Sequence, residues 1–256
     1  MNFSFPPALE SFPLLSAGSA LFLDLDGTLA DITTTPSRTI VRADVLKTLS
    51  ELLKPLDGAL AIVSGRPIAD IDRLCWPYRF TAAGQHGLEL RHVDGAIERV
   101  EENIQSLTAI QNEITFFHRA YPQLLLEYKG LSLAVHYRQA PKMEKIVEAK
   151  LSRLVAQYPE FRLQKGKMVC EIRLRGADKG TAIQALLKEV PFKGKVPIFV
   201  GDDVTDEDGF RMINRLQGIS IKIGKEDTCA RHCMKNTEQF RSWLLESAIK
   251  LRRVRA

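Results

Sequence analysis

The segment LFLDLDGT at residues 21–28 places two carboxylates directly after an apolar run. The apolar residues predict a strand at 20–25 that is buried in the core of the protein. Burying Asp24 and Asp26 beside them would be costly unless a cation or hydrogen-bond donors received the carboxylates. The segment therefore predicts a core strand that ends at a metal or phosphate site.

Apolar runs and helical patterns alternate along the first and last parts of the chain. Residues 45–53 carry leucines at helical spacing and are followed by the apolar run 59–63. Such alternation is typical of a parallel sheet with helices on both faces, so the sequence predicts an α/β core. The same order of helix, strand, helix and strand returns at 180–190, 196–200, 207–216 and 219–223.

The middle of the chain follows a different pattern. Asp94-Gly95 predicts a hairpin turn, and further strand pairs are predicted around Lys129-Gly130 and Lys165-Gly166, with a helix at 143–155 between them. This order predicts an α+β domain that is inserted into the core. The predicted boundaries are 1–105 for the first part of the core, 106–176 for the inserted domain and 177–256 for the second part of the core.

Composition and charge are those of an ordinary globular protein, with 45% hydrophobic and 26% charged residues. No segment approaches the about 18 uninterrupted apolar residues that a membrane helix requires. The net charge of +5 rests largely on residues 250–255, which carry four basic side chains, so the rest is nearly balanced. A basic helix end of this kind is usually solvated. We therefore expect a monomer with no nucleic-acid partner and no membrane partner.

The cysteines show no disulfide framework, because the four lie at irregular spacing, at Cys75, Cys170, Cys229 and Cys233. Such spacing fits a reducing compartment, and the N-terminal residues lack the basic start of a signal peptide. We therefore expect a cytoplasmic protein. Cys229, His232 and Cys233 lie close together in the sequence, but a four-ligand zinc site would need further ligands and no second pair is present.

Residues 24–28 suit a ligand site at the end of a strand. Side chains alternate in an extended segment, so Asp24 and Asp26 are expected to face one way. Gly27 lets the chain turn sharply, and Thr28 adds a hydroxyl. Ligands of open α/β sheets bind at the carboxyl ends of the strands. Both acids are therefore expected to share one pocket, whereas a lone Asp-Gly pair would be a turn with a helix-capping carboxylate.

A second candidate segment, Ser64-Gly65-Arg66-Pro67, follows the predicted strand 59–63 directly. It offers a hydroxyl and backbone N–H groups at a strand-to-helix turn, where Pro67 suits the first helical turn. Such a turn binds anions readily. The alternative is that Ser64 simply caps the helix.

The third and fourth candidate segments lie in the last part of the chain. Lys179 precedes a predicted helix, and its ammonium group suits a place between a carboxylate and a phosphate. Residues 201–207, GDDVTDE, follow the predicted strand 196–200. Acids gathered without a base repel one another, and a hard divalent cation such as Mg²⁺ relieves the repulsion. A purely structural acidic cap is the alternative, while the spacing of an EF-hand calcium loop is absent.

In this order, the four segments resemble the motifs of the haloacid dehalogenase phosphatase superfamily. Residues 24–28 are similar to its first motif, Ser64 to its second, Lys179 to its third and 201–206 to its fourth. The resemblance spans nearly the whole chain, and the stretch between Ser64 and Lys179 has the length of the family's second type of cap. It implies a Rossmann-like parallel-sheet core with an inserted α+β cap domain of the C2 type.

Further motifs resemble the short bacterial type of the trehalose-6-phosphate phosphatase family. In that family, carboxylates and a lysine of the cap bind sugar hydroxyls, which implies Glu127, Lys129 and Glu171 in this chain. Leu174 departs from the family, which usually has a proline between the last strand of the cap and the lysine motif. This difference bears on the geometry of the linker rather than on the chemistry of the site. The motifs are QHG at 85–87, EYKG at 127–130, HYR at 136–138, EI at 171–172 and GDDVTDE at 201–207.

The resemblance implies a Mg²⁺-dependent phosphatase that hydrolyses a sugar phosphate, trehalose 6-phosphate, through an aspartyl-phosphate intermediate. Asp24 would be the nucleophile, Asp26 the general acid and base, and Lys179 the third catalytic residue. The implied metal ligands are Asp24, Asp26 through its backbone carbonyl, Asp202 and Asp206. The implied substrate-binding residues are Gly27, Thr28, Ser64, Gly65, Arg66, His86, Glu127, Lys129, Arg138 and Glu171.

Two other interpretations of the sequence stay open. A related enzyme of the same superfamily would act on another sugar phosphate, that of sucrose, glucosylglycerol or mannosylglycerate. A catalytically silent sugar-phosphate sensor would use the same scaffold without turnover. Such a sensor would be expected to lack the nucleophile or the metal ligands, all of which are present here.

Overall fold

The structure of the protein, a computed structural model, describes residues 12–33, 38–99, 104–128, 132–166 and 168–255. Its contacts divide the chain into two compact units. Unit 1 consists of Met1–Glu98 and Asp178–Ala256, and unit 2 of Arg99–Ala177. The inserted unit therefore begins at Arg99, whereas the sequence placed its start at residue 106.

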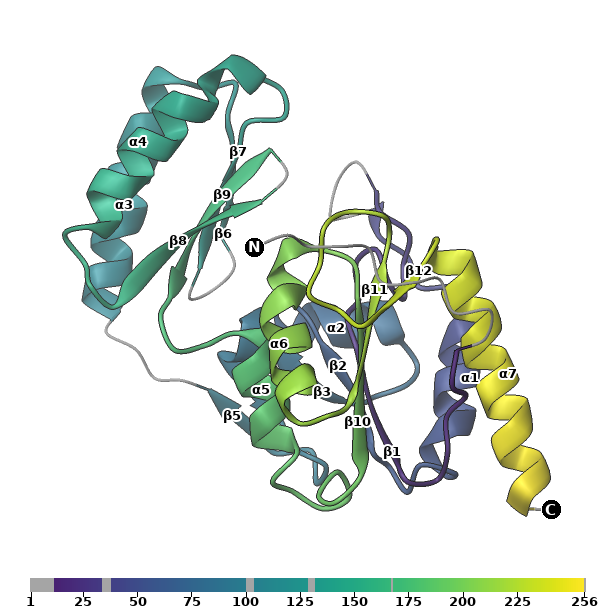
Figure 1. Cartoon of the computed structure of the whole chain (residues 1–256). Coiled ribbons are helices and arrows are strands. Elements are labelled where there is room, and N and C mark those ends of the chain that lie inside the picture. Colours follow the sequence, from purple (N-terminus) through teal and green to yellow (C-terminus); the bar gives the residue numbers. More distant parts are fainter. Residues whose placement is uncertain (1–11, 34–37, 100–103, 129–131, 167, 256) are drawn as a thin grey trace. The chain divides into compact units, whose positions relative to one another are not determined.

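Unit 1 is built on an eight-stranded sheet (Figure 1). Six of its strands run parallel, and β1 lies between β10 and β2. The fourth strand in sequence, β4, pairs antiparallel with β3. The strands, in their order across the sheet, are β12 (His232–Met234), β11 (Ile219–Ile223), β10 (Val196–Gly201), β1 (Ser19–Leu23), β2 (Leu60–Val63), β3 (Thr81–Gly84), β4 (Glu89–Arg91) and β5 (Ile97–Arg99).

Helices cover both faces of this sheet. Leu21 and Leu23 of β1 share one buried cluster with α1, α2 and α7, while Ala20 and Phe22 share another with α5 and α6. Successive residues of β1 thus face two different cores, which is why the strand is apolar at every position. The predicted α/β core is confirmed. The helices are α1 (Ala43–Leu53), α2 (Ile68–Cys75), α5 (Lys179–Leu186), α6 (Glu207–Arg215) and α7 (Thr237–Arg255).

The two central strands end at different places from those predicted. β1 ends at Leu23 rather than at residue 25, and the backbone then turns through Gly27, whose φ of 80° lies in the left-handed region. β10 instead continues one residue further than predicted, to Gly201. Asp24 and Asp202 therefore each follow immediately after the last residue of a paired strand.

Unit 2 contains a four-stranded antiparallel sheet in the order β6-β7-β9-β8, with two helices along one face (Figure 1). Leu133, Val135 and Ile172 are buried. Glu127, Ala134 and Glu171 are register partners on neighbouring strands, so their side chains share the opposite face. The elements are α3 (Ile104–Ala120), β6 (Leu125–Tyr128), β7 (Leu133–His136), α4 (Glu144–Val155), β8 (Phe161–Gly166) and β9 (Val169–Leu174).

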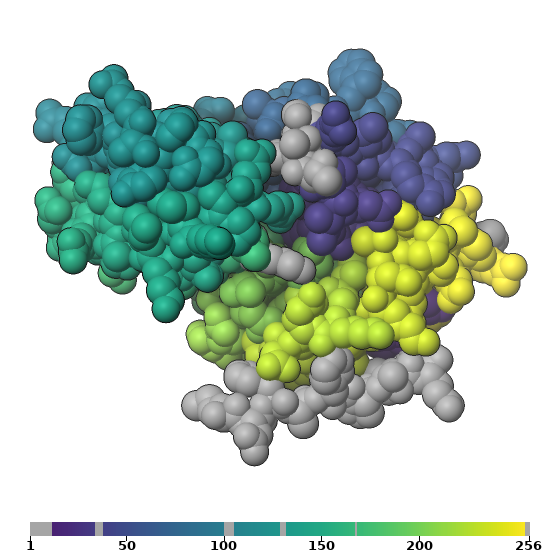
Figure 2. All heavy atoms as spheres, turned by 90° about the horizontal axis from the view of Figure 1, so that it is seen from above, coloured from purple at the N-terminus to yellow at the C-terminus, as the bar shows by residue number. Residues whose placement is uncertain are grey.

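The early and late parts of unit 1 are joined at the surface as well as in the sheet. Asp31 accepts hydrogen bonds from Thr237 Oγ1 at 2.7 Å and from Arg241 Nη2 at 2.8 Å. In Figure 2 the purple residues of the first part accordingly border the yellow residues of α7. None of the helices formed by the described residues combines the length and the apolarity needed to cross a bilayer.

Candidate active site

Chemically active side chains converge at the carboxyl ends of the parallel strands of unit 1. Asp24 follows β1, Ser64 follows β2 and Asp202 follows β10. Because β1 lies between β2 and β10, the three side chains start from neighbouring strands at the same edge of the sheet. This is the edge at which open α/β sheets bind their ligands.

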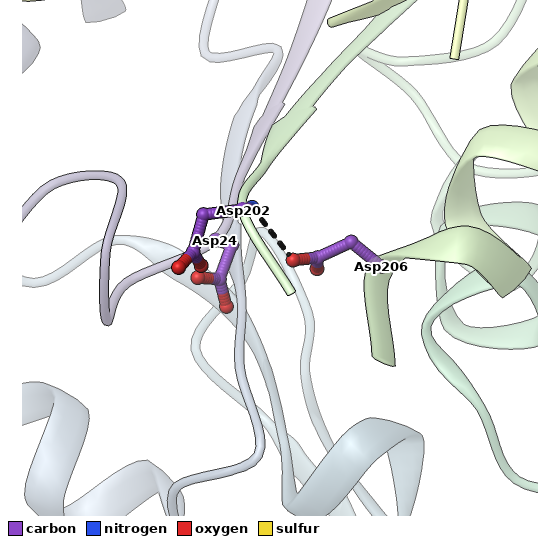
Figure 3. Close-up of side chains that lie close together, drawn as sticks. All are labelled: Asp24, Asp202 and Asp206. Carbon is purple, nitrogen blue, oxygen red and sulfur yellow. Dashed lines mark hydrogen bonds between the residues drawn. The ribbon is translucent and has the colours of Figure 1, made fainter. Parts of the chain in front are cut away.

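Three carboxylates form the centre of the site. One oxygen of each of Asp24, Asp202 and Asp206 lies within 4.8 Å of the others. Figure 3 shows these three side chains close together. Asp206 sits in η4 (Val204–Asp206), and its Oδ2 accepts hydrogen bonds from the backbone N–H groups of Asp202 and Asp203, each at 2.9 Å. The motif therefore folds back on itself, and this holds Asp206 against the end of β10.

Lys179 joins two of these carboxylates. Its Nζ donates to Asp24 Oδ1 at 2.5 Å and to Asp206 Oδ1 at 2.6 Å, and the residue is 2% exposed. Lys179 is the first residue of α5, and Asp178 caps the helix in a reciprocal pair with Thr181. The cap fixes the start of the helix, and so the direction from which the ammonium group enters the site.

Burial and mutual repulsion shape the charges of the cluster. Burial raises the pKa of Asp24 well above its usual value, against the ammonium of Lys179, and the charges of Asp206 and Asp202 raise it further. Burial and then Asp206 raise the pKa of Asp202 to about 7. Burial alone would lower the pKa of Lys179, but Asp206 and Asp24 raise it above its usual value. Full ionisation of the three carboxylates is therefore costly, because one lysine neutralises only part of the negative charge that they would carry.

Two buried oxygens of the site lack a hydrogen-bond partner in the described part of the chain: Asp202 Oδ1 and the hydroxyl of Thr28. Unpaired buried oxygens are costly and usually mark the place of an ion or a ligand. Gly27 leaves room for Asp202, because a side chain at residue 27 would collide with that carboxylate. Oxygen donors of this kind fit a hard divalent cation.

Asp26 does not join this cluster through its carboxylate. Its oxygens accept from Arg66 Nε at 2.6 Å and Nη2 at 2.7 Å, and from Thr39 Oγ1 at 3.2 Å. The expectation that Asp24 and Asp26 face one pocket assumed an extended backbone to residue 26. Because β1 ends at Leu23 and the chain then turns, the alternation of an extended strand does not continue to Asp26, and its carboxylate pairs with Arg66 and Thr39.

The Ser64 segment is held by the chain that follows β3. Ser64 is buried, and its Oγ accepts from the backbone N–H of Arg66 at 3.2 Å. The N–H of His86 donates to the carbonyl of Ser64 at 2.9 Å, and its ring lies against Gly65, where any side chain would collide with it. His86 and Gly65 thus contact each other and shape the loop that carries Ser64.

The predicted sugar-binding residues belong to unit 2. Glu127 Oε2 lies 2.9 Å from His136 Nε2, and Glu171 Oε1 accepts from Ser132 Oγ at 2.7 Å. Both glutamates lie on the sheet face opposite Leu133, Val135 and Ile172. Arg138 is exposed just after β7, and Lys129 lies outside the described residues.

Two residues near the site were not found by sequence reasoning. Lys222 on β11 is buried and donates to the carbonyl oxygen of Asp202. The sequence does contain a sign of this role, because Lys222 is a charged residue inside the mostly apolar predicted strand 219–223. Thr39 contacts Asp26 but lies in a polar stretch that has no motif, so its pattern gave no sign. The four cysteines are free, and Cys229 and Cys233 belong to no metal-ligand group among the described residues.

Comparison with known proteins points to one family. The sequence profile described as trehalose-phosphatase matches residues 22–241. A trehalose-6-phosphate phosphatase of Escherichia coli is 42% identical over 236 residues, which are 92% of this chain and 89% of that protein. The predicted family resemblance is therefore confirmed.

Solved structures agree in fold. The C-terminal domain of trehalose-6-phosphate phosphatase from C. albicans covers 96% of this chain with 99% of its own residues, at a TM-score of 0.82 and 19% identity. A trehalose-6-phosphate phosphatase related protein covers 91% of this chain and 99% of its own, at a TM-score of 0.74 and 25% identity. These similarities confirm the predicted core with its inserted unit.

Proposed function

We propose how the hydrolysis of a sugar phosphate is divided among the residues of this chain, which belongs to the trehalose-phosphatase family. The chain is a phosphoric monoester hydrolase that cleaves trehalose 6-phosphate to trehalose and phosphate. The arrangement of Lys179 between Asp24 and Asp206, beside Asp202, is the observation that supports the division of roles below.

In the first step, a carboxylate oxygen of Asp24 attacks the phosphorus of the substrate. A bond forms between Asp24 and phosphorus, and the bond from phosphorus to the sugar oxygen breaks. Asp26 gives a proton to the departing oxygen, which leaves as the hydroxyl of trehalose. Lys179 and the hydroxyl of Ser64 offset the negative charge of the phosphoryl group during transfer.

In the second step, water attacks the phosphorus of the aspartyl-phosphate. Asp26, which has lost its proton, takes one from the water, and the bond between Asp24 and phosphorus breaks. Phosphate leaves and both carboxylates return to their first state. Covalent catalysis thus replaces one difficult displacement with two easier ones that share the same acid and base.

Mg²⁺ is the cofactor that we propose for this site. Asp24, Asp202 and Asp206, with the backbone carbonyl of Asp26, would hold it, and oxygen ligands are those that Mg²⁺ prefers. When bound, the cation offsets the repulsion between an anionic nucleophile and an anionic phosphate. The unpaired Asp202 Oδ1 supports this proposal, because a cation would supply the partner that it lacks.

Removal of divalent cations tests both the activity and the cofactor. We expect the purified protein to release phosphate from trehalose 6-phosphate, and a chelator in excess to lower that rate by about 10²-fold or more. Added Mg²⁺ should restore the rate, whereas Ca²⁺, which tolerates a looser geometry, should restore it poorly. Phosphate release is measured across a panel of sugar phosphates. Full activity in chelator would contradict the cofactor, and no activity on trehalose 6-phosphate would contradict the substrate.

The carboxylates of unit 2 are proposed to bind the sugar. We expect Glu171→Ala to lower kcat/KM for trehalose 6-phosphate by about 10²-fold, since a charged hydrogen-bond partner of the sugar is lost. For p-nitrophenyl phosphate, which has no sugar hydroxyls, the loss should stay within about threefold. Steady-state kinetics on both substrates measure the difference.

The matched control for this prediction is Glu113→Ala, which removes a glutamate of the same unit whose exposed side chain pairs with Lys150. This variant should leave kcat/KM unchanged for both trehalose 6-phosphate and p-nitrophenyl phosphate. Equal losses on both substrates for Glu171→Ala would argue against a sugar-binding role.

A further inference from the structure

The carboxylate of Asp26 is held by a closed network of three side chains. Arg66 contacts both of its oxygens, through Nε at 2.6 Å and Nη2 at 2.7 Å. The same Nη2 donates to Thr39 Oγ1 at 2.8 Å, and Thr39 in turn donates to Asp26 Oδ1 at 3.2 Å. Arg66 and Thr39 are both buried, so the network closes around the carboxylate from the protein side.

We propose that Arg66 and Thr39 are positioning residues, which hold the carboxylate of Asp26 in the orientation that its two proton transfers require. The proposal rests on the proposed role of Asp26 as general acid and base. It also changes the role of Arg66, which the family resemblance placed among the substrate-binding residues.

The geometry of Arg66 favours this role over substrate binding. Its side chain is 10% exposed, and all three guanidinium nitrogens face protein groups. Nε and Nη2 contact Asp26 and Thr39, and Nη1 lies 3.9 Å from Asp70 Oδ2. A guanidinium that already engages a carboxylate bidentately has its fork committed to that partner.

A bidentate contact controls orientation as well as distance. A carboxylate held by one hydrogen bond can rotate, whereas two parallel bonds from a planar guanidinium fix the plane of the carboxylate. General acid and base catalysis depends on this alignment, and a misplacement of about 1 Å can cost about 10²-fold in rate. Asp26 needs such support because its side chain is 42% exposed and the residue lies within the turn that follows β1.

The backbone of Arg66 is itself fixed by the rest of the site. Its N–H donates to Ser64 Oγ at 3.2 Å, and its carbonyl accepts from the N–H of Gln85 at 2.9 Å. Gln85 and His86 have φ values of 47° and 59°, in a region of backbone conformation that residues other than glycine rarely adopt. Backbone of this kind persists where its surroundings require it. Arg66 therefore links the loop of Ser64 to the orientation of Asp26.

A double-mutant cycle tests whether Arg66 acts through Asp26. We expect Arg66→Ala to lower kcat for trehalose 6-phosphate by about 10²-fold with KM changed by less than about threefold. In an Asp26→Asn background, the same substitution should lower kcat by less than about twofold, because the group that it positions is already gone. Arg73→Ala, which removes an exposed arginine of α2, serves as the control and should leave kcat and KM unchanged.

Thr39→Val keeps the test valid if Arg66→Ala does not fold. It removes only a hydroxyl, and we expect about a fivefold fall in kcat that also disappears in the Asp26→Asn background. Circular dichroism and thermal unfolding establish that each variant is folded. Arg66→Lys should recover only part of the activity of Arg66→Ala, since an ammonium group cannot contact both oxygens in one plane.

A single-turnover experiment separates positioning from substrate binding. With enzyme in excess over p-nitrophenyl phosphate, release of nitrophenolate reports attack by Asp24, and this leaving group departs without a proton. We expect Arg66→Ala to keep this rate within about threefold of the unchanged protein. An arginine that bound the phosphoryl group would instead slow it by about 10²-fold or more.

The outcomes distinguish this inference from the function on which it rests. A fall in kcat that is as large in the Asp26→Asn background as in the unchanged protein would overturn the positioning role, as would slow nitrophenolate release. Normal turnover of Asp26→Asn alone would instead refute the proposed acid and base, whatever Arg66 does. If Arg66→Ala lowers kcat only in the protein that retains Asp26, the result supports the inference.

Discussion

Asp24→Asn is expected to bind trehalose 6-phosphate but to release no phosphate, with kcat lower by about 10⁴-fold or more. Asparagine has the shape of aspartate and keeps one oxygen to accept from Lys179. Its amide cannot form the bond to phosphorus that the first step requires. Calorimetric titration with the substrate in the presence of Mg²⁺ measures binding, and a phosphate assay measures turnover.

The control for this prediction is Asp44→Asn, which makes the same chemical change on the exposed surface of α1, where Asp44 pairs with Arg42. It should leave both binding and turnover unchanged. Turnover of Asp24→Asn within about tenfold of the unchanged protein would refute the assignment of the nucleophile. Rapid trapping with acid should also detect no phosphorylated protein in this variant, although the unchanged protein should yield some.

Lys179→Met is expected to impair both activity and stability. The substitution keeps the length of the side chain but removes the charge between Asp24 and Asp206, which are both buried. Loss of one partner of a buried ion pair costs about 3–5 kcal/mol in the free energy of unfolding. We expect kcat to fall by about 10³-fold as well, because the phosphoryl group loses a preorganised cation.

Thermal unfolding with and without Mg²⁺ separates the two effects. Because the variant leaves the carboxylates with less compensation, Mg²⁺ should raise its Tm by more than it raises that of the unchanged protein. Lys188→Met, which removes an exposed lysine just after α5, is the matched control and should alter neither Tm nor kcat. Unchanged stability and unchanged turnover of Lys179→Met would show that this lysine is not the counter-ion of the site.

Much of the site follows from sequence because it depends on strand ends. Asp24 and Asp202 stand directly after apolar runs, and in a parallel sheet the ends of neighbouring strands meet without further information. Lys179 could be added because its helix starts at the same edge of the sheet. The family resemblance supplied the order of the motifs and the length of the inserted unit.

The rest depends on where the chain turns and on contacts between distant residues. The surroundings of the Asp26 carboxylate could not be predicted because β1 ends at Leu23, and the end of a strand is poorly defined by an apolar pattern that continues to residue 25. Its partners Arg66 and Thr39 are set by packing rather than by spacing. Periodicity along one chain does not carry that information.

The pairing of β1 with both β2 and β10 has a consequence for the synthesis of the chain. The ribosome makes β1 and β2 early, but the second neighbour of β1 emerges only after the whole of unit 2. Until then the nascent protein carries an apolar strand with one open edge, which is a surface prone to aggregation. Chaperone dependence should therefore be greatest for nascent chains that stop between Ala177 and Val196, and no such fragment can assemble the three carboxylates.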